Sequence, residues 1–209
     1  MAYSLNPSSD NCYEGTTCLV NKLGIRDEKK LSEIEAQITF AKAVMLEETP
    51  IDDDFGFEHF KKIHDFLLCD LYEWAGQVRT VDISKKRTKF LDAASVESIG
   101  TKCFSKVKEG YFENLPFDEF VKRIAEFYND VNYIHPFREG NGRTQRIYFA
   151  QLIRHYGYDI NFADVDTDER GLSERTFRNA RLPEQDAPLP DAGQIYPRAG
   201  GKGREELRS

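Results

Sequence analysis

The sequence has no long apolar run and no apolar core near its N-terminus. A transmembrane helix needs about 20 predominantly apolar residues, and a secretory signal needs a shorter apolar segment close to the start. We therefore expect a cytoplasmic protein without a membrane partner, or one delivered into a host cytosol by a secretion system that reads no such signal.

Cysteine is scarce, and no two cysteines form a Cys-x-x-Cys pair: the four are Cys12, Cys18, Cys69 and Cys103. A chain of 209 residues is long enough to bury a full core without disulfides. We interpret the four as reduced thiols and expect Cys69 and Cys103 in the core. His59, His64 and His155 likewise lack partners at metal-ligand spacing, so we expect structural roles for all three.

Clusters of basic residues are also missing. The net charge is −7, and the 29 lysines and arginines are dispersed along the chain. Affinity for a phosphate backbone requires clustered lysine and arginine. We therefore predict no nucleic-acid partner.

Apolar residues at helical spacing fill most of the chain. Asp27 is a suitable N-cap for a helix that ends at Thr49-Pro50, with the apolar stripe Leu31, Ile34, Ile38, Ala41 and Met45. Further helices are predicted from Phe60 to Trp74, from about Ala94 to Glu109, from Phe117 to Ile134, over Ile147–Ile153 and from Val165 to Arg181.

The segment from Arg79 to Phe90 carries the one convincing strand signal, because Val81 and Ile83 alternate with polar residues around a charged tip. The predicted fold class is all-α, a helical bundle with one β-hairpin. One domain covers residues 1–181. Residues 182–209 are rich in proline and glycine and are predicted to form a disordered tail or a linker.

The stretch from His135 to Arg146 concentrates the chemistry of the chain: His-Pro-Phe-Arg-Glu-Gly-Asn-Gly-Arg-Thr-Gln-Arg. Gly140 and Gly142 allow the backbone to curl with its N–H groups pointing inward, and the helix that follows directs its dipole at the same point. Such a nest at a helix N-terminus binds phosphate. Arg143 and Arg146 are three residues apart, hence on one helical face, and offer forked donors to a polyphosphate.

Two further residues of this stretch have alternative interpretations. A polyphosphate usually brings Mg²⁺, and Glu139 is the nearest carboxylate able to hold it; otherwise it is an acid favoured by the helix dipole. His135 is a candidate general base, since a near-neutral imidazole can accept a hydroxyl proton. The alternative is a histidine that merely ends a core helix.

The stretch resembles the signature of the Fic family, His-x-Phe-x-(Asp/Glu)-Gly-Asn-Gly-Arg-x-x-Arg, with every specified position filled. The resemblance covers Tyr13 to Arg181, and it implies a mostly helical fold that transfers AMP from ATP to a protein hydroxyl. It also implies that the amide of Asn141 and the backbone of Gly140 and Gly142 hold the α-phosphate. By the same resemblance Arg143 binds the β-phosphate and Arg146 the γ-phosphate.

The resemblance implies that the hairpin is the family's flap, which docks a target protein by adding a strand. The expected docking residues are Val81, Asp82, Ile83, Ser84, Lys85, Lys86 and Arg87. Their positive tip fits an acidic target loop, although the same charges are equally expected on a merely soluble hairpin.

Many Fic proteins carry an inhibitory motif, (Ser/Thr)-x-x-x-Glu-(Gly/Asn). The one match that we identify, Ser105 to Gly110, lies in mid-domain, where the family does not place this motif. The resemblance therefore implies either a separate small antitoxin-like inhibitor or a protein without this brake. Two other readings stay open: a Fic-fold transferase that uses another nucleotide or group, and a catalytically silent interaction module.

Overall fold

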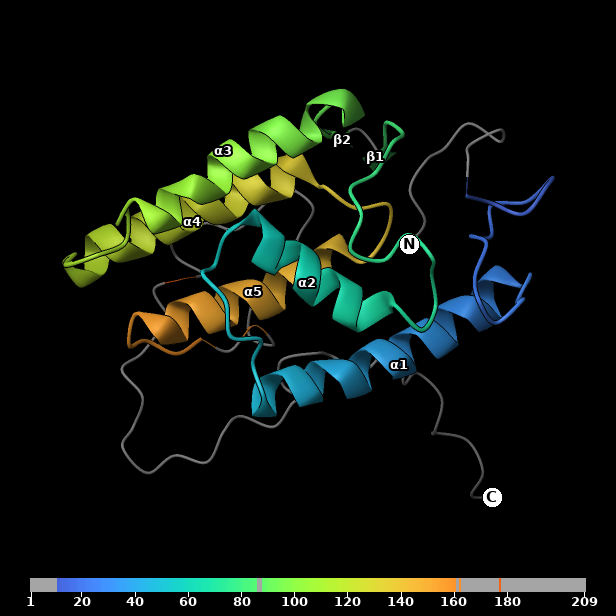
Figure 1. Ribbon diagram of the computed structural model, residues 1–209, viewed down its shortest axis with the longest axis horizontal. Helices are drawn as coiled ribbons and strands as arrows, with labels where there is room; N and C mark the ends of the chain where they lie inside the picture. Colours follow the sequence, from blue (N-terminus) through green and yellow to red (C-terminus); the bar gives the residue numbers. More distant parts are fainter. Residues whose placement is uncertain (1–10, 86–87, 161, 163–176, 178–209) are drawn as a thin grey trace, which may run out of the picture.

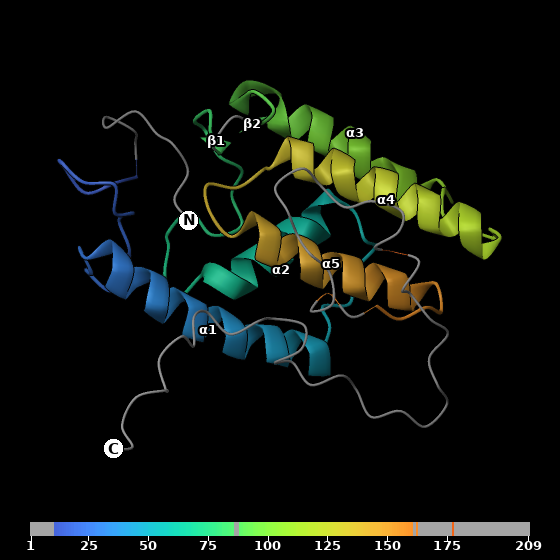
Figure 2. The same ribbon diagram turned by 180° about the vertical axis from the view of Figure 1, so that it is seen from behind.

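A computed structural model describes residues 11–85, 88–160, 162 and 177, and these form a helical bundle (Figure 1). Helix α2 (Phe57–Leu68) lies between α1 (Glu28–Glu48) on one side and α3 (Val96–Lys108) and α4 (Phe117–Ile134) on the other. Helix α5 (Asn141–His155) packs against α1, α2 and α4 and comes to the front when the molecule is turned (Figure 2). The predicted all-α fold is confirmed. The helix expected from Val165 to Arg181 and the tail at 182–209 lie outside the described residues, except for the buried Phe177.

Helix α1 begins and ends where the sequence predicts, but it buries a different face. The Asp27 carboxylate accepts a hydrogen bond from the Lys30 N–H at 2.9 Å, as an N-cap should. The buried residues, however, are Leu31, Glu35, Thr39, Ala43 and Leu46. Of the predicted stripe, Leu31 is buried and Ile38 packs partly against the core, but Met45 is exposed. The rest of the buried face was missed because the prediction counted apolar residues alone. The true inner face includes an acid and a hydroxyl, which indicates a polar partner beneath α1.

Helix α2 is shorter than predicted. It ends at Leu68, and the remaining apolar residues up to Trp74 belong to a succession of turns. Cys69 is the C-cap residue and is only half-buried, so its predicted core position was wrong. Cys103 is buried as expected, and Cys18 is buried as well; all four cysteines are free thiols.

The predicted hairpin is present, with strands of two residues each. Strand β1 (Ser84–Lys85) pairs antiparallel with β2 (Thr88–Lys89) in the register Ser84 to Lys89 and Lys85 to Thr88. The tip residues Lys86 and Arg87 lie outside the described part of the chain. A 3₁₀ turn, η1 (Ala93–Ser95), leads from the hairpin into α3.

The core is aromatic and surrounds the first half of α5. Tyr148 contacts the rings of Phe60, Phe104 and Phe127, which come from α2, α3 and α4. Burial of several such rings fixes three helices around α5, and hence the position of its N-terminus. Across the described ranges, none of the helices combines the length and apolarity needed to cross a bilayer.

Candidate active site

The loop from His135 to Gly140 connects α4 to α5 and is closed by its own side chains. Asn141, almost fully buried, accepts a hydrogen bond from the Phe137 N–H at 2.8 Å and donates one to the Phe137 carbonyl at 2.7 Å. Gly140 has φ +81°, and a Cβ there would lie 2.5 Å from Leu68 Cδ1. Glycine is therefore required for both backbone and space. These contacts fix the conformation of the loop, and the N–H groups that begin α5 lie at its end.

His135 occupies the C-cap of α4 in a left-handed conformation, with φ +45°. Its Nδ1 lies 3.1 Å from the Asn132 carbonyl, so Nδ1 carries the ring proton and Nε2 holds the lone pair. Burial lowers the pKa of His135 to about 3, and the nearby Arg79 acts in the same direction. The imidazole is thus neutral at physiological pH, which a proton acceptor must be.

Arg79 fixes the position of His135 and of the hairpin together. Its backbone N–H donates to the Pro136 carbonyl at 2.8 Å, and its Nε donates to the His135 carbonyl at 2.8 Å. Its two terminal nitrogens donate to the carbonyls of Val81, Leu91 and Ile134. One buried guanidinium therefore ties both ends of the hairpin to the loop beneath it.

Glu139 and Arg143 meet a third charged residue that the sequence did not predict. The Arg143 guanidinium donates to Glu35 on α1 through Nη2, to Thr39 through Nη1 at 3.2 Å, and lies 3.4 Å from Glu139. The other carboxylate oxygen of Glu35 accepts from the Tyr72 hydroxyl. Burial, together with the charge of Glu35, raises the pKa of Glu139 despite its contact with Arg143.

His64 supports the same loop from below. Its ring stacks on Phe137 with centroids 3.7 Å apart, Nδ1 accepts from the Gly76 N–H at 2.9 Å, and Nε2 lies 3.0 Å from the Glu139 carbonyl. Because Nδ1 accepts, Nε2 carries the proton and donates to that carbonyl. The predicted structural role of His64 fits this geometry, but the part it supports is the loop of the candidate site.

The structure brings the predicted phosphate-binding residues to one place, the first two turns of α5 and the loop before it. A Cβ on Gly142 would lie 3.5 Å from Nη1 of Arg146, which places that guanidinium over the nest. Ile83 is buried, Val81, Ser84 and Lys85 are half-buried, and Asp82 is exposed and accepts from the Ala93 N–H at 2.7 Å. These hairpin residues follow directly from Arg79 and so begin next to His135.

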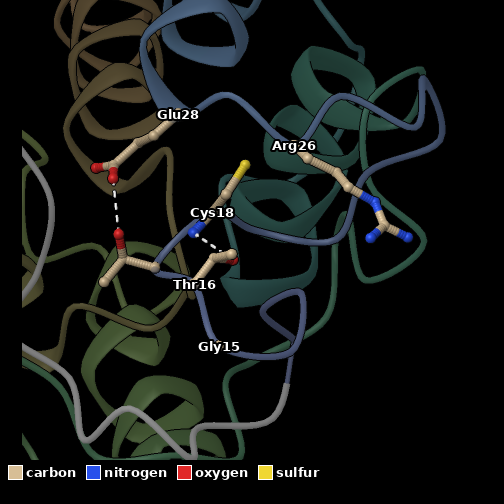
Figure 3. Close-up of a pocket in the computed structure, with 6 residues that line it drawn as sticks. Gly15, Thr16, Cys18, Arg26 and Glu28 are labelled. Atoms are coloured by element: carbon tan, nitrogen blue, oxygen red, sulfur yellow. Dashed lines mark hydrogen bonds between the residues drawn. The ribbon is translucent and has the colours of Figure 1, made fainter.

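A separate hollow of about 420 Å³ lies at the start of α1 (Figure 3). Glu28 accepts a hydrogen bond from the Thr17 hydroxyl at 2.7 Å, while Arg26 extends in another direction (Figure 3). The lining residues are Gly15, Thr16, Thr17, Cys18, Arg26 and Glu28. None of the residues predicted to bind nucleotide lines this hollow.

Comparison with known proteins agrees with the motif. Residues 54–153 match the model of the Fic/DOC family. A Salmonella typhimurium protein named Fic, described as a probable protein adenylyltransferase, is 32% identical over 194 residues, which cover 92% of each chain. This chain belongs to the Fic/DOC family.

Two other Fic proteins extend the comparison. The protein adenylyltransferase VbhT of Bartonella schoenbuchensis is 37% identical over 170 residues, but this chain spans only 36% of its length. The N-terminal Fic domain of a VirB-translocated effector of Bartonella quintana, solved with bound ADP, is 27% identical. It superposes with a TM-score of 0.71 over 76% of this chain and 81% of the other. The Fic fold predicted from the sequence is therefore confirmed.

Proposed function

We propose that this Fic protein is a protein adenylyltransferase, which transfers AMP from Mg²⁺-bound ATP to the hydroxyl of a tyrosine, serine or threonine on a target protein. The observation that carries the proposal is the neutral imidazole of His135, fixed beside the phosphate nest at the start of α5. The names of its relatives and the ADP bound to one of them support the same activity.

In this proposal each group has a task. Nε2 of His135 accepts the proton of the target hydroxyl as its oxygen forms a bond to the α-phosphorus. The bond from that phosphorus to the oxygen shared with the β-phosphate breaks, and pyrophosphate leaves. The N–H groups of Gly140 to Gly142 and the dipole of α5 stabilise charge on the α-phosphate. Arg143 and Arg146 hold the β- and γ-phosphates.

The residues present fit a magnesium ion at Glu139. Its Oε1 accepts from the Gly140 N–H at 2.9 Å and lies 3.4 Å from Arg143, so Oε2 is the oxygen that would bind the cation. Magnesium typically takes one or two carboxylates together with phosphate oxygens. When bound, the ion would neutralise phosphate charge.

The hairpin is proposed to receive the target. Strand addition would use an edge of this short hairpin, and the proposal is supported by Arg79, which donates both to the His135 carbonyl and to the Val81 carbonyl of the hairpin segment. A separate inhibitor protein is proposed as well. The internal match to the inhibitory motif ends at Glu109 and Gly110, where α3 ends, and that end is remote from the start of α5 (Figures 1 and 2).

The test is an incubation of the protein, Mg²⁺ and lysate with ATP labelled on either the α- or the γ-phosphate. Label transferred to a protein from the α-position alone supports AMP transfer. Label from the γ-position would show a phosphotransferase. His135→Ala should abolish labelling while ATP binding by calorimetry persists, and His155→Ala on the exposed end of α5 is the matched control. Absence of nucleotide binding in the wild type would indicate a silent interaction module.

A further inference from the structure

Arg143 is held by a set of side chains that the family signature does not contain. Glu35 and Thr39 lie one turn apart on the buried face of α1, and both contact the guanidinium. Glu35 is itself fixed, because its second oxygen accepts from the Tyr72 hydroxyl, and Tyr72 is almost fully buried. Hydrogen bonds therefore connect Tyr72, in the turns after α2, through Glu35 on α1 to Arg143 in the first turn of α5.

The negative charge of Glu35 is unfavourable for phosphate binding at Arg143. A carboxylate that is only 8% exposed next to a phosphate-binding arginine opposes phosphate binding, unless it contributes something else. Two contributions follow from the contacts. Arginine has many rotamers, and a partner that fixes its fork leaves fewer to be lost when phosphate binds. In addition, the guanidinium lies closer to Glu35 than to Glu139, which it approaches only to 3.4 Å.

We propose that Glu35 is a positioning residue of the nucleotide site: it aims Arg143 at the β-phosphate and limits the contact of the guanidinium with Glu139 to the 3.4 Å approach at Oε1, so that Oε2 of Glu139 remains available to Mg²⁺. The inference rests on the proposed function, because it takes the nest as an ATP site. Glu35 itself touches neither nucleotide nor metal.

The proposal predicts an effect that depends on the number of phosphates. Calorimetric titration of the Glu35→Ala protein with ADP and ATP in Mg²⁺ should show affinities reduced about 10- to 100-fold, the usual range for groups that orient a binding side chain. Affinity for AMP, which lacks the β-phosphate, should change less than twofold. The Mg²⁺ concentration needed for half-maximal ATP affinity should rise, because Arg143, released from Glu35, then pairs more closely with Glu139 than at the present 3.4 Å.

A matched control exists on the same two helices. Glu47 on α1 pairs with Arg154 on α5, again as a largely buried carboxylate and guanidinium. It lies 12 residues beyond Glu35, or about 18 Å along the helix. Glu47→Ala should lower thermal stability while leaving the affinities for AMP, ADP and ATP unchanged. Tyr72→Phe retains the charge of Glu35 but frees its second oxygen, and it should reproduce part of the loss for ADP and ATP.

A double-mutant cycle tests whether Glu35 acts through Arg143. In an Arg143→Ala background, Glu35→Ala should have no further effect on ADP affinity. An additive loss would overturn the proposal, and so would equal losses for AMP and ADP. Tighter ATP binding by Glu35→Ala would also overturn it, since Glu35 would then be a competitor of phosphate. Glu35→Gln repeats the titration if the alanine variant fails to fold. Failure of the wild type to bind any nucleotide would instead remove the proposed function.

Discussion

The ring of Phe90, at the end of the hairpin, stacks on the imidazole of His135, with centroids 3.8 Å apart and planes 13° from parallel. Phe90 is buried, and the next residue, Leu91, donates its N–H to the carbonyl of Tyr133, two residues before His135. The segment proposed to bind the target is thus in direct contact with the proposed base. We therefore expect docking of a target on the hairpin to be coupled to the orientation of the imidazole.

Phe90→Leu should reduce the rate of target modification about 10- to 100-fold, because a base displaced by a fraction of an ångström transfers its proton poorly. ATP affinity should be unchanged, because the group on which Phe90 stacks is the proposed base, which acts on the target hydroxyl. The measurement is a single-turnover assay with saturating ATP. Phe117→Leu, which alters an aromatic residue at the far end of α4, is the control. A parallel loss of ATP affinity would show that Phe90 belongs to the nucleotide site instead.

Arg79→Lys should lower the free energy of unfolding, although the charge is retained. A lysine has no fork and cannot reach the carbonyls of Val81, Leu91, Ile134 and His135 at once. Each buried carbonyl left without a donor costs about 1–3 kcal/mol, so urea denaturation should show a loss of at least about 3 kcal/mol. The half-exposed Arg123→Lys should lose less than about 1 kcal/mol. Equal losses for the two variants would contradict the role given to Arg79.

The sequence predicted the helical bundle, which the structure confirms, because a bundle depends on local patterns: capping and apolar periodicity. The phosphate nest and the general base stay predictions, derived from glycine spacing and from the resemblance to the Fic signature. The sequence did not predict Glu35, Thr39, Tyr72, His64 or Phe90 as parts of the site. Each reaches the loop from a distant element, and no local pattern records such a contact. One signal was present for Glu35 and Thr39. Leu31, Glu35, Thr39 and Ala43 recur at intervals of four residues. This spacing indicates one helical face, even though two of its members are polar.

Stability should fall between pH 7 and pH 5, with His64 as one cause. Burial lowers the pKa of His64 from its ordinary value of 6.5 to about 3. Between pH 7 and pH 5 the unfolded chain binds more protons than the folded one. The stabilisation that comes from a neutral His64 is therefore complete above the unfolded pKa and is lost as pH falls. At pH 5 the loss is about 2 kcal/mol for one such group.

Urea denaturation at pH 7 and pH 5 measures this dependence. His64→Gln is less stable at pH 7, since the stacking on Phe137 is altered, but its decline toward pH 5 should be smaller than that of the wild type by about 2 kcal/mol. His155→Gln, at an exposed position, should decline as the wild type does. If the stability of His64→Gln fell from pH 7 to pH 5 as much as that of the wild type, His64 would accept a proton in the folded protein. It would then not stay neutral as the acceptor of the Gly76 N–H.

Charge on the hairpin should control how fast a target associates. Lys85 is half-buried on β1, next to the proposed docking edge, and an acidic target segment would be attracted to it before its backbone pairs. Lys85→Glu should slow target modification about two- to fivefold at low ionic strength. The difference should vanish near 0.5 M salt, because exposed charges are screened over less than about 10 Å. ATP affinity should stay the same.

Lys122→Glu, exposed on α4, makes the same change in net charge away from the hairpin. If both variants slow modification equally, the target responds to the overall charge of the protein; if neither does at low salt, Lys85 contributes only to solubility.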